Sequence, residues 1–125
     1  MNLLIAGSRT FQDYGILEKH MTECDAIFHW DQYDTVLSGA ARGADLLGER
    51  WAEANGKLIK RFPALWELYG KKAGMIRNAQ MIHEAQAVVV FWDGVSSGAK
   101  HTLQLAQKHR LPYSMYNLSV QRTLS

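Results

Sequence analysis

The sequence predicts an α/β fold with a mostly parallel, five-stranded sheet and helices on both faces. Short apolar runs alternate along the chain with longer segments whose apolar residues recur at helical spacing. Short connections between them are typical of parallel strands joined by crossover helices. The run 87–92 (AVVVFW) is apolar without alternation, as expected for a strand that is covered on both faces.

Five strands and four intervening helical segments are predicted in order. The strands are 2–6, 35–37, 57–62, 87–92 and 112–116. The helices are 10–24, 42–55, 64–85 in two pieces divided near Gly70, and 98–109. Segment 25–33 could finish the first helix or form a loop. We expect strand order 3-2-1-4-5, because this order brings the ends of strands one, two and four together.

Length and composition indicate one globular domain. The chain has 125 residues, of which 47% are hydrophobic and 21% charged, and this balance excludes disordered and fibrous proteins. We assign the domain to residues 1–116 and a polar tail to 117–125. A net charge of +2 without a basic run argues against a nucleic-acid partner.

The same composition limits the covalent and metal chemistry. Cys24 is the single cysteine, which excludes an internal disulfide framework, and the five histidines show no metal-ligand spacing. We therefore predict no metal and no cofactor. No apolar stretch approaches the roughly 20 residues of a membrane span, and no basic region precedes the first apolar run. We expect a cytoplasmic protein with no membrane partner.

The loop after the first strand carries the candidate ligand residues Gly7, Ser8 and Arg9. Ligands of parallel sheets bind outside the carboxyl ends of the strands. Gly7 permits a sharp turn, and Arg9 can bind a phosphate through two N–H groups. An ordinary turn followed by a solvated arginine explains the same residues about equally well.

The loop after the second strand is SGAARGAD, residues 38–45. Small residues let a ligand approach the backbone, and the following helix offers free N–H groups. Asp45 could bind ribose hydroxyls or complement the helix dipole. The segment is neither the dinucleotide fingerprint nor a P-loop. Its candidate ligand residues are Ser38, Gly39, Arg42, Gly43 and Asp45.

The loop after the fourth strand, DGVSSG, is a second candidate anion site. A turn with serine capping is the alternative. Three strand ends with glycines and hydroxyls in one small domain favour a ligand site over turns alone. The candidates here are Asp93, Gly94, Ser96, Ser97 and Gly98.

The helix before the fourth strand adds Arg77 and Asn78, which share a face with Gly74. This polar pair is unusual for core packing, although Arg77 could instead make a structural ion pair. Trp66 could be core or a wall on which a base stacks. His101 lies one turn into the next helix and could face the same pocket.

Four segments, in order, resemble the small YspA and cpYpsA-related family of the SLOG superfamily, which is named after DprA/Smf and the Lonely Guy proteins. The resemblance implies a Rossmann-like fold and a pocket for a nucleotide or a nucleotide-derived molecule such as an ADP-ribose-like ligand. Many members of this family sit in phage or mobile-element genomes. This chain has Ala40 and Ala99 where glycine and threonine are usual. The segments are GSRTF (7–11), SGAARGAD (38–45), the W-x-x-Y-G-K-x-A-G-x-x-R-N-x-x-M pattern (66–81) and FWDGVSSG (91–98).

The distantly similar Lonely Guy phosphoribohydrolases imply a catalytic role at Arg77. Their glutamate has no counterpart, since the chain continues from Gly98 with Ala99, Lys100 and His101. A carboxylate is the natural group to stabilise an oxocarbenium-like sugar. His101 or Asp93 would have to replace it. We therefore favour ligand binding, for sensing or sequestration, and keep N-glycosidic hydrolysis of a nucleotide as the alternative.

Aromatic residues near the first helix suggest self-association. Phe28, Trp30 and Tyr33 cluster in or near a polar segment. Large exposed apolar patches usually mark interfaces. We expect a homodimer or a higher oligomer.

Overall fold

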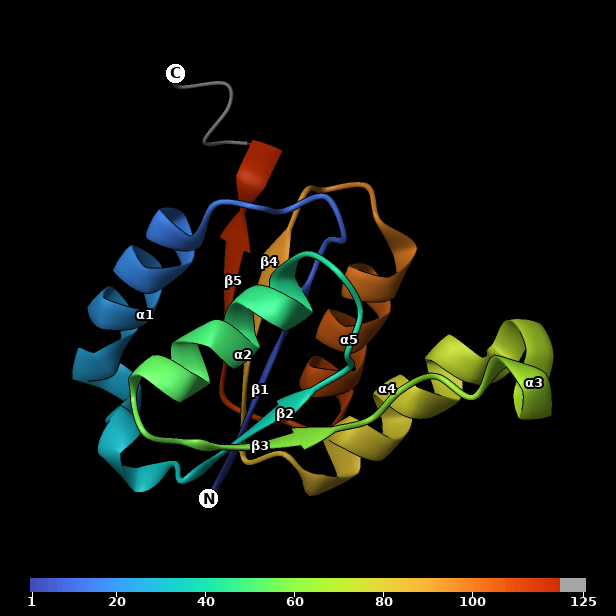
Figure 1. Cartoon of the computed structure of the whole chain (residues 1–125), viewed down its shortest axis with the longest axis horizontal. Coiled ribbons are helices and arrows are strands. Elements are labelled where there is room, and N and C mark those ends of the chain that lie inside the picture. The colour runs from blue at the N-terminus through green and yellow to red at the C-terminus, as the bar shows by residue number, and fades with distance from the viewer. Residues whose placement is uncertain (120–125) are drawn as a thin grey trace.

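A computed structural model describes residues 1–119 and confirms the predicted sheet (Figure 1). All neighbouring strands are parallel, and the order is β3-β2-β1-β4-β5. β1 lies at the centre, with Leu4 opposite Leu37 on one side and Val88 on the other. The strands are β1 (Asn2–Gly7), β2 (Thr35–Ser38), β3 (Leu58–Arg61), β4 (Ala87–Trp92) and β5 (Tyr113–Asn117).

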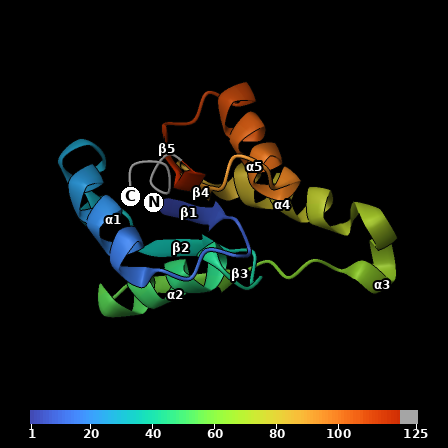
Figure 2. The same ribbon diagram turned by 90° about the horizontal axis from the view of Figure 1, so that it is seen from above.

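Helices cover both faces of the sheet (Figure 2). Successive side chains of a strand point to opposite faces. Accordingly, Leu3 and Ile5 are buried in the core on the side of α1 and α2, while Leu4 and Ala6 are buried on the side of α4 and α5. The helices are α1 (Tyr14–Phe28), α2 (Ala44–Ala54), α4 (Ala73–Glu84) and α5 (Ser97–Lys108).

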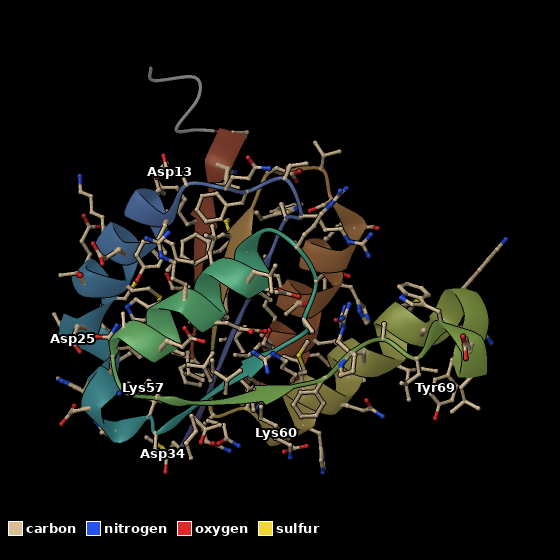
Figure 3. The ribbon with its side chains drawn as sticks, in the orientation of Figure 1. Asp13, Asp25, Asp34, Lys57, Lys60 and Tyr69 are labelled. Atoms are coloured by element: carbon tan, nitrogen blue, oxygen red, sulfur yellow. The ribbon has the colours of Figure 1, made fainter. Side chains whose placement is uncertain are left out.

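The first helix begins and ends four residues later than predicted. Asp13, labelled in Figure 3, caps α1 by accepting a hydrogen bond from the Ile16 N–H at 3.2 Å. The chain leaves the helix at His29, which has a left-handed φ of 57°, and continues as η1 (Trp30–Gln32). The ambiguous segment therefore both finishes the helix and forms a turn.

The aromatic residues of this turn belong to the core, so the predicted exposed patch is wrong. Trp30 and Tyr33 are each only 5% exposed. The Trp30 indole N–H donates to the Met21 carbonyl oxygen at 2.7 Å, and its ring stacks on Phe28. Buried residues cannot form a docking surface, so this cluster gives no support to the expected oligomer.

The segment between β3 and α4 projects from the body of the molecule (Figures 1 and 2). It contains α3 (Trp66–Tyr69) and η2 (Gly70–Lys72). The predicted division near Gly70 is confirmed, because this residue has a φ of +58° and ends α3.

The chain remains part of the folded body slightly beyond residue 116. β5 ends at Asn117, and Leu118 is buried in the core. Residues 120–125 of the predicted tail lie outside the described residues. Within residues 1–119, no helix combines the length and the hydropathy that crossing a membrane requires.

Candidate functional site

A cavity of about 880 Å³ lies where the predicted loops meet, beside the carboxyl end of β1. Its walls come from the loops after β1, β2 and β4 and from α4 and α5. A ligand site at this edge is expected, because the neighbours of β1 on its two sides are reached by crossovers in opposite directions. The sequence candidates that line the cavity are Gly7, Arg9, Arg42, Asp45, Arg77, Asn78, Asp93, Ser96, Ser97, Gly98 and His101.

Five other candidates do not line the cavity: Ser8, Ser38, Gly39, Gly43 and Gly94. Ser8 is buried and joins two of the loops. Its hydroxyl lies 2.9 Å from the Ser96 hydroxyl and accepts a hydrogen bond from the Asp93 N–H at 3.0 Å. Ser8 therefore fixes the position of the loop after β4.

The Ser38 hydroxyl makes its hydrogen bonds to groups of the protein itself. It donates to Glu49 Oε2 at 2.6 Å and accepts from the Ala40 N–H at 3.1 Å. The other carboxylate oxygen of Glu49, Oε1, accepts two hydrogen bonds from Arg61 on β3, at 3.0 and 2.7 Å. This network joins β2, α2 and β3 beneath the site.

Gly39 separates Asp45 from Arg77. A Cβ at this position would lie 2.6 Å from Asp45 Oδ2 and 2.8 Å from Arg77 Nη1. The Gly39 carbonyl oxygen accepts a hydrogen bond from Arg77 Nη1 at 2.7 Å. Glycine therefore allows α4 to approach the loop after β2.

Arg77 is held by hydrogen bonds to neutral groups. Its Nε donates to Asn78 Oδ1 at 2.9 Å, in addition to the bond from Nη1 to Gly39. Asn78 Nδ2 lies 3.2 Å from His101 Nδ1, which connects α4 to α5. These contacts orient the guanidinium at the cavity wall, and within residues 1–119 its Nη2 group makes no hydrogen bond.

The cavity carries more positive than negative side chains. Besides the three predicted arginines, Lys71 and Lys100 line it, against the carboxylates of Asp45 and Asp93. Sequence reasoning missed both lysines, because spacing alone does not show which side of a short turn or first helical turn a lysine occupies. The further lining residues include Thr10, Trp66, Met75, Thr102 and Gln104.

The two carboxylates have opposite environments. Burial raises the pKa of Asp45 to about 6, although the Ala41 N–H and the charge of Arg77 oppose this rise. Hydrogen bonds from the backbone N–H groups of Ser96 and Val95 lower the pKa of Asp93. Burial also lowers the pKa of His101. At neutral pH, Asp93 is therefore ionised, and His101 is mainly neutral.

Asp45 makes stability depend on pH. The carboxyl of an aspartate has an ordinary pKa of 3.8, and that of Asp45 is about 6 in the folded protein. Between these values the folded state keeps a proton that the unfolded chain has released, so stability falls as pH rises through this window. Relative to Asp45→Asn, the free energy of unfolding of the wild type should fall by about 2–3 kcal/mol between about pH 4 and pH 7. Urea unfolding across this range measures the difference, and parallel profiles would contradict the assignment.

The first turn of α5 offers unused backbone donors. Ser96 provides no side-chain cap, and the first backbone bond of the helix runs from the Lys100 N–H to the Ser96 carbonyl oxygen. Within residues 1–119, the N–H groups of Ser97, Gly98 and Ala99 have no protein acceptor, and all three residues line the cavity. By contrast, the Ala44 N–H at the start of α2 donates to the Ser8 carbonyl oxygen. The helix start near Gly98 thus keeps backbone donors without a protein acceptor among the described residues, whereas the helix start near Gly43 has one of its N–H groups bonded within the protein.

Ala40 adopts a backbone conformation that favours glycine, with a φ of +59°. A left-handed conformation costs an alanine about 1–2 kcal/mol, while glycine loses more entropy on folding. Ala40→Gly should therefore raise the free energy of unfolding by about 0.5–1 kcal/mol. The control is Ala41→Gly. Because Ala41 has no positive φ, this substitution should lower the free energy of unfolding. Urea unfolding compares the two variants, and equal effects would refute the strain argument.

Comparisons with known proteins identify relatives of this chain. A family model described as the YspA, cpYpsA-related SLOG family matches residues 1–69. The Gene 61 protein of Mycobacterium phage D29 is 36% identical in an alignment of length 120 that covers 88% of this chain and 91% of that protein. No solved structure matches the chain significantly. With more than half of the chain matched by the family model, and the predicted motifs gathered around one cavity, the chain belongs to the YspA and cpYpsA-related SLOG family.

Proposed function

We propose that this protein binds a nucleotide or a nucleotide-derived small molecule, such as an ADP-ribose-like ligand, in the cavity beside β1. The observation that carries the proposal is the first turn of α5, where N–H groups without a protein acceptor among residues 1–119 belong to residues that line a cavity with five cationic and two acidic side chains. Backbone N–H groups at a helix start and arginine side chains are the usual donors to phosphate. The bound molecule is therefore an anion with phosphate groups.

The phosphate would lie between α5 and α4. The N–H groups of Ser97 and Gly98 face it from one side, and the Nη2 group of Arg77 from the other. Arg9 and Arg42 are exposed at the cavity, so their side chains can turn toward further phosphate groups. Several donors from separate elements suit a ligand with more than one phosphate oxygen to satisfy.

The remainder of the cavity suits a nucleoside. Small-molecule sites enclose about 300–1,000 Å³, and this cavity lies toward the upper end at about 880 Å³. Trp66 lines it and is 52% exposed, so it presents an aromatic face to a base. Asp45 and Asn78 supply acceptors for ribose hydroxyls.

Binding without cleavage fits the residues of α5. The helix contains no Asp or Glu, and Lys100 and His101 line the cavity where the related enzymes supply a carboxylate. We therefore favour a sensing or sequestering role over N-glycosidic hydrolysis. Similarity to a phage protein supports a phage or mobile-element origin.

Mass spectrometry after incubation with AMP, GMP and ADP-ribose tests the proposal. We expect the intact nucleotide to be recovered from the denatured protein. Release of free base would support the hydrolase instead, and the absence of any bound nucleotide would contradict the proposal. Arg9→Ala should weaken binding, whereas Lys19→Ala, which removes the same charge from the exposed side of α1, should not.

A further inference from the structure

The segment that projects between β3 and α4 carries a concentration of exposed apolar side chains. We call residues 65–75 the apolar arm. Trp66 packs over Gly74, because a Cβ at that glycine would lie 3.6 Å from the indole, so the arm is folded back on α4. Tyr69 lies far from the sheet (Figure 3). The arm residues that are between 41% and 68% exposed are Leu65, Trp66, Leu68, Tyr69 and Met75.

Charges of both signs accompany this surface. Glu67 lies in α3, and Lys71 and Lys72 lie in η2. Within residues 1–119, none of the three forms an ion pair. One short segment thus presents an acid near its start and two bases near its end, beside apolar side chains.

We propose that the apolar arm is a self-association surface, which pairs with the arm of a second copy about a twofold axis. In a twofold contact the same patch serves both copies, so residue i meets residue j and residue j meets residue i. An antiparallel pairing of the arms places Glu67 of each copy opposite Lys71 or Lys72 of the other. This charge complementarity favours a second copy over an unrelated partner.

The size of the surface fits a modest dimer. Aromatic side chains such as those of Trp66 and Tyr69 offer on the order of 200 Å² each, and this area is an upper value for the leucines and Met75. With about half of it exposed on five residues, the pair of arms would bury at most roughly 1,000 Å², which is near the lower limit for a specific interface. The dimer should therefore dissociate on dilution.

The proposed dimer would also border the ligand cavity, although the inference does not depend on the proposed ligand. Trp66, Lys71 and Met75 belong both to the arm and to the cavity lining. A second copy bound to the arm would therefore lie next to the cavity.

Sedimentation across a dilution series of the full chain tests this inference. We expect the wild type to pass from 14.2 kDa toward twice that mass as concentration rises. Leu68→Glu places a charge at a 68% exposed arm position outside the cavity lining and should remain a monomer throughout. Ile27→Glu is the control, because Ile27 is 78% exposed on α1 and should not affect the dimer.

Circular dichroism should show that both variants are folded. A wild type that stays monomeric at every concentration would overturn the inference and leave the arm to a different partner. A dimer that survives Leu68→Glu, or that Ile27→Glu disrupts equally, would place the interface elsewhere. Nucleotide binding by each variant is measured separately, so a failed dimer and a failed ligand site give different results.

Discussion

Gly7→Ala should destabilise the protein by about 3 kcal/mol or more, because its side chain would collide with the neighbouring strand. A Cβ at residue 7 would lie 2.1 Å from the Phe91 carbonyl oxygen and 2.9 Å from Ala44 Cβ. The first of these atoms belongs to the β4 backbone, and it accepts a hydrogen bond from the Ser8 N–H at 2.8 Å. Moving it would disturb the sheet and the cavity together. Urea unfolding measures the loss.

Gly56→Ala is the matched control for this prediction. Gly56 has a φ of +68°, but a Cβ there would meet nothing within 4 Å. The Gly56→Ala substitution should therefore lower the free energy of unfolding only by the backbone strain, about 1 kcal/mol. If the two variants lose similar stability, close packing at Gly7 is not what the position requires.

Arg77→Ala should weaken nucleotide binding about ten- to hundredfold, since it removes a charge-assisted hydrogen bond of about 1.5–3 kcal/mol. Arg77 lines the cavity and has its Nη2 group available to a ligand. Calorimetric titration with the nucleotide that is recovered by mass spectrometry measures the change. Unchanged affinity in a folded Arg77→Ala protein would remove this residue from the site.

The same variant should also lower the melting temperature. Arg77 Nη1 donates to the Gly39 carbonyl oxygen, so its loss leaves that oxygen without this bond. Arg77→Lys separates the two roles. Lysine keeps the charge but cannot reproduce the planar pair of donors, so affinity should recover only in part. Full recovery with lysine would show that charge alone acts at this position.

The order of elements and much of the cavity followed from the sequence. The apolar run of β4 was predicted with its observed bounds, because a strand covered on both faces leaves a local signature. Eight of the nine predicted elements differ from the observed ones mainly at their ends, because capping residues set where a helix begins and stops. For example, the Asp13 cap places the start of α1 at Tyr14. The loops after β1, β2 and β4 met at one cavity because parallel strands end at a common edge.

Side-chain roles within those loops needed the tertiary structure. Ser38 and Ser96 look alike in sequence, yet Ser38 is buried against Glu49 while Ser96 lines the cavity. Trp30 lies in a polar segment, but it packs against Trp51 of α2. Each outcome depends on a partner at least 11 positions away in the chain.

The sequence by itself therefore determined the fold class, the family and the loops that meet at the cavity. The tertiary structure decided which hydroxyls and charges face the cavity, which helix start keeps free N–H groups, and which apolar residues remain exposed. The physical reason is range: helical and strand periodicity arise between neighbours in sequence, whereas burial and hydrogen-bond partners arise between elements that only the fold brings together.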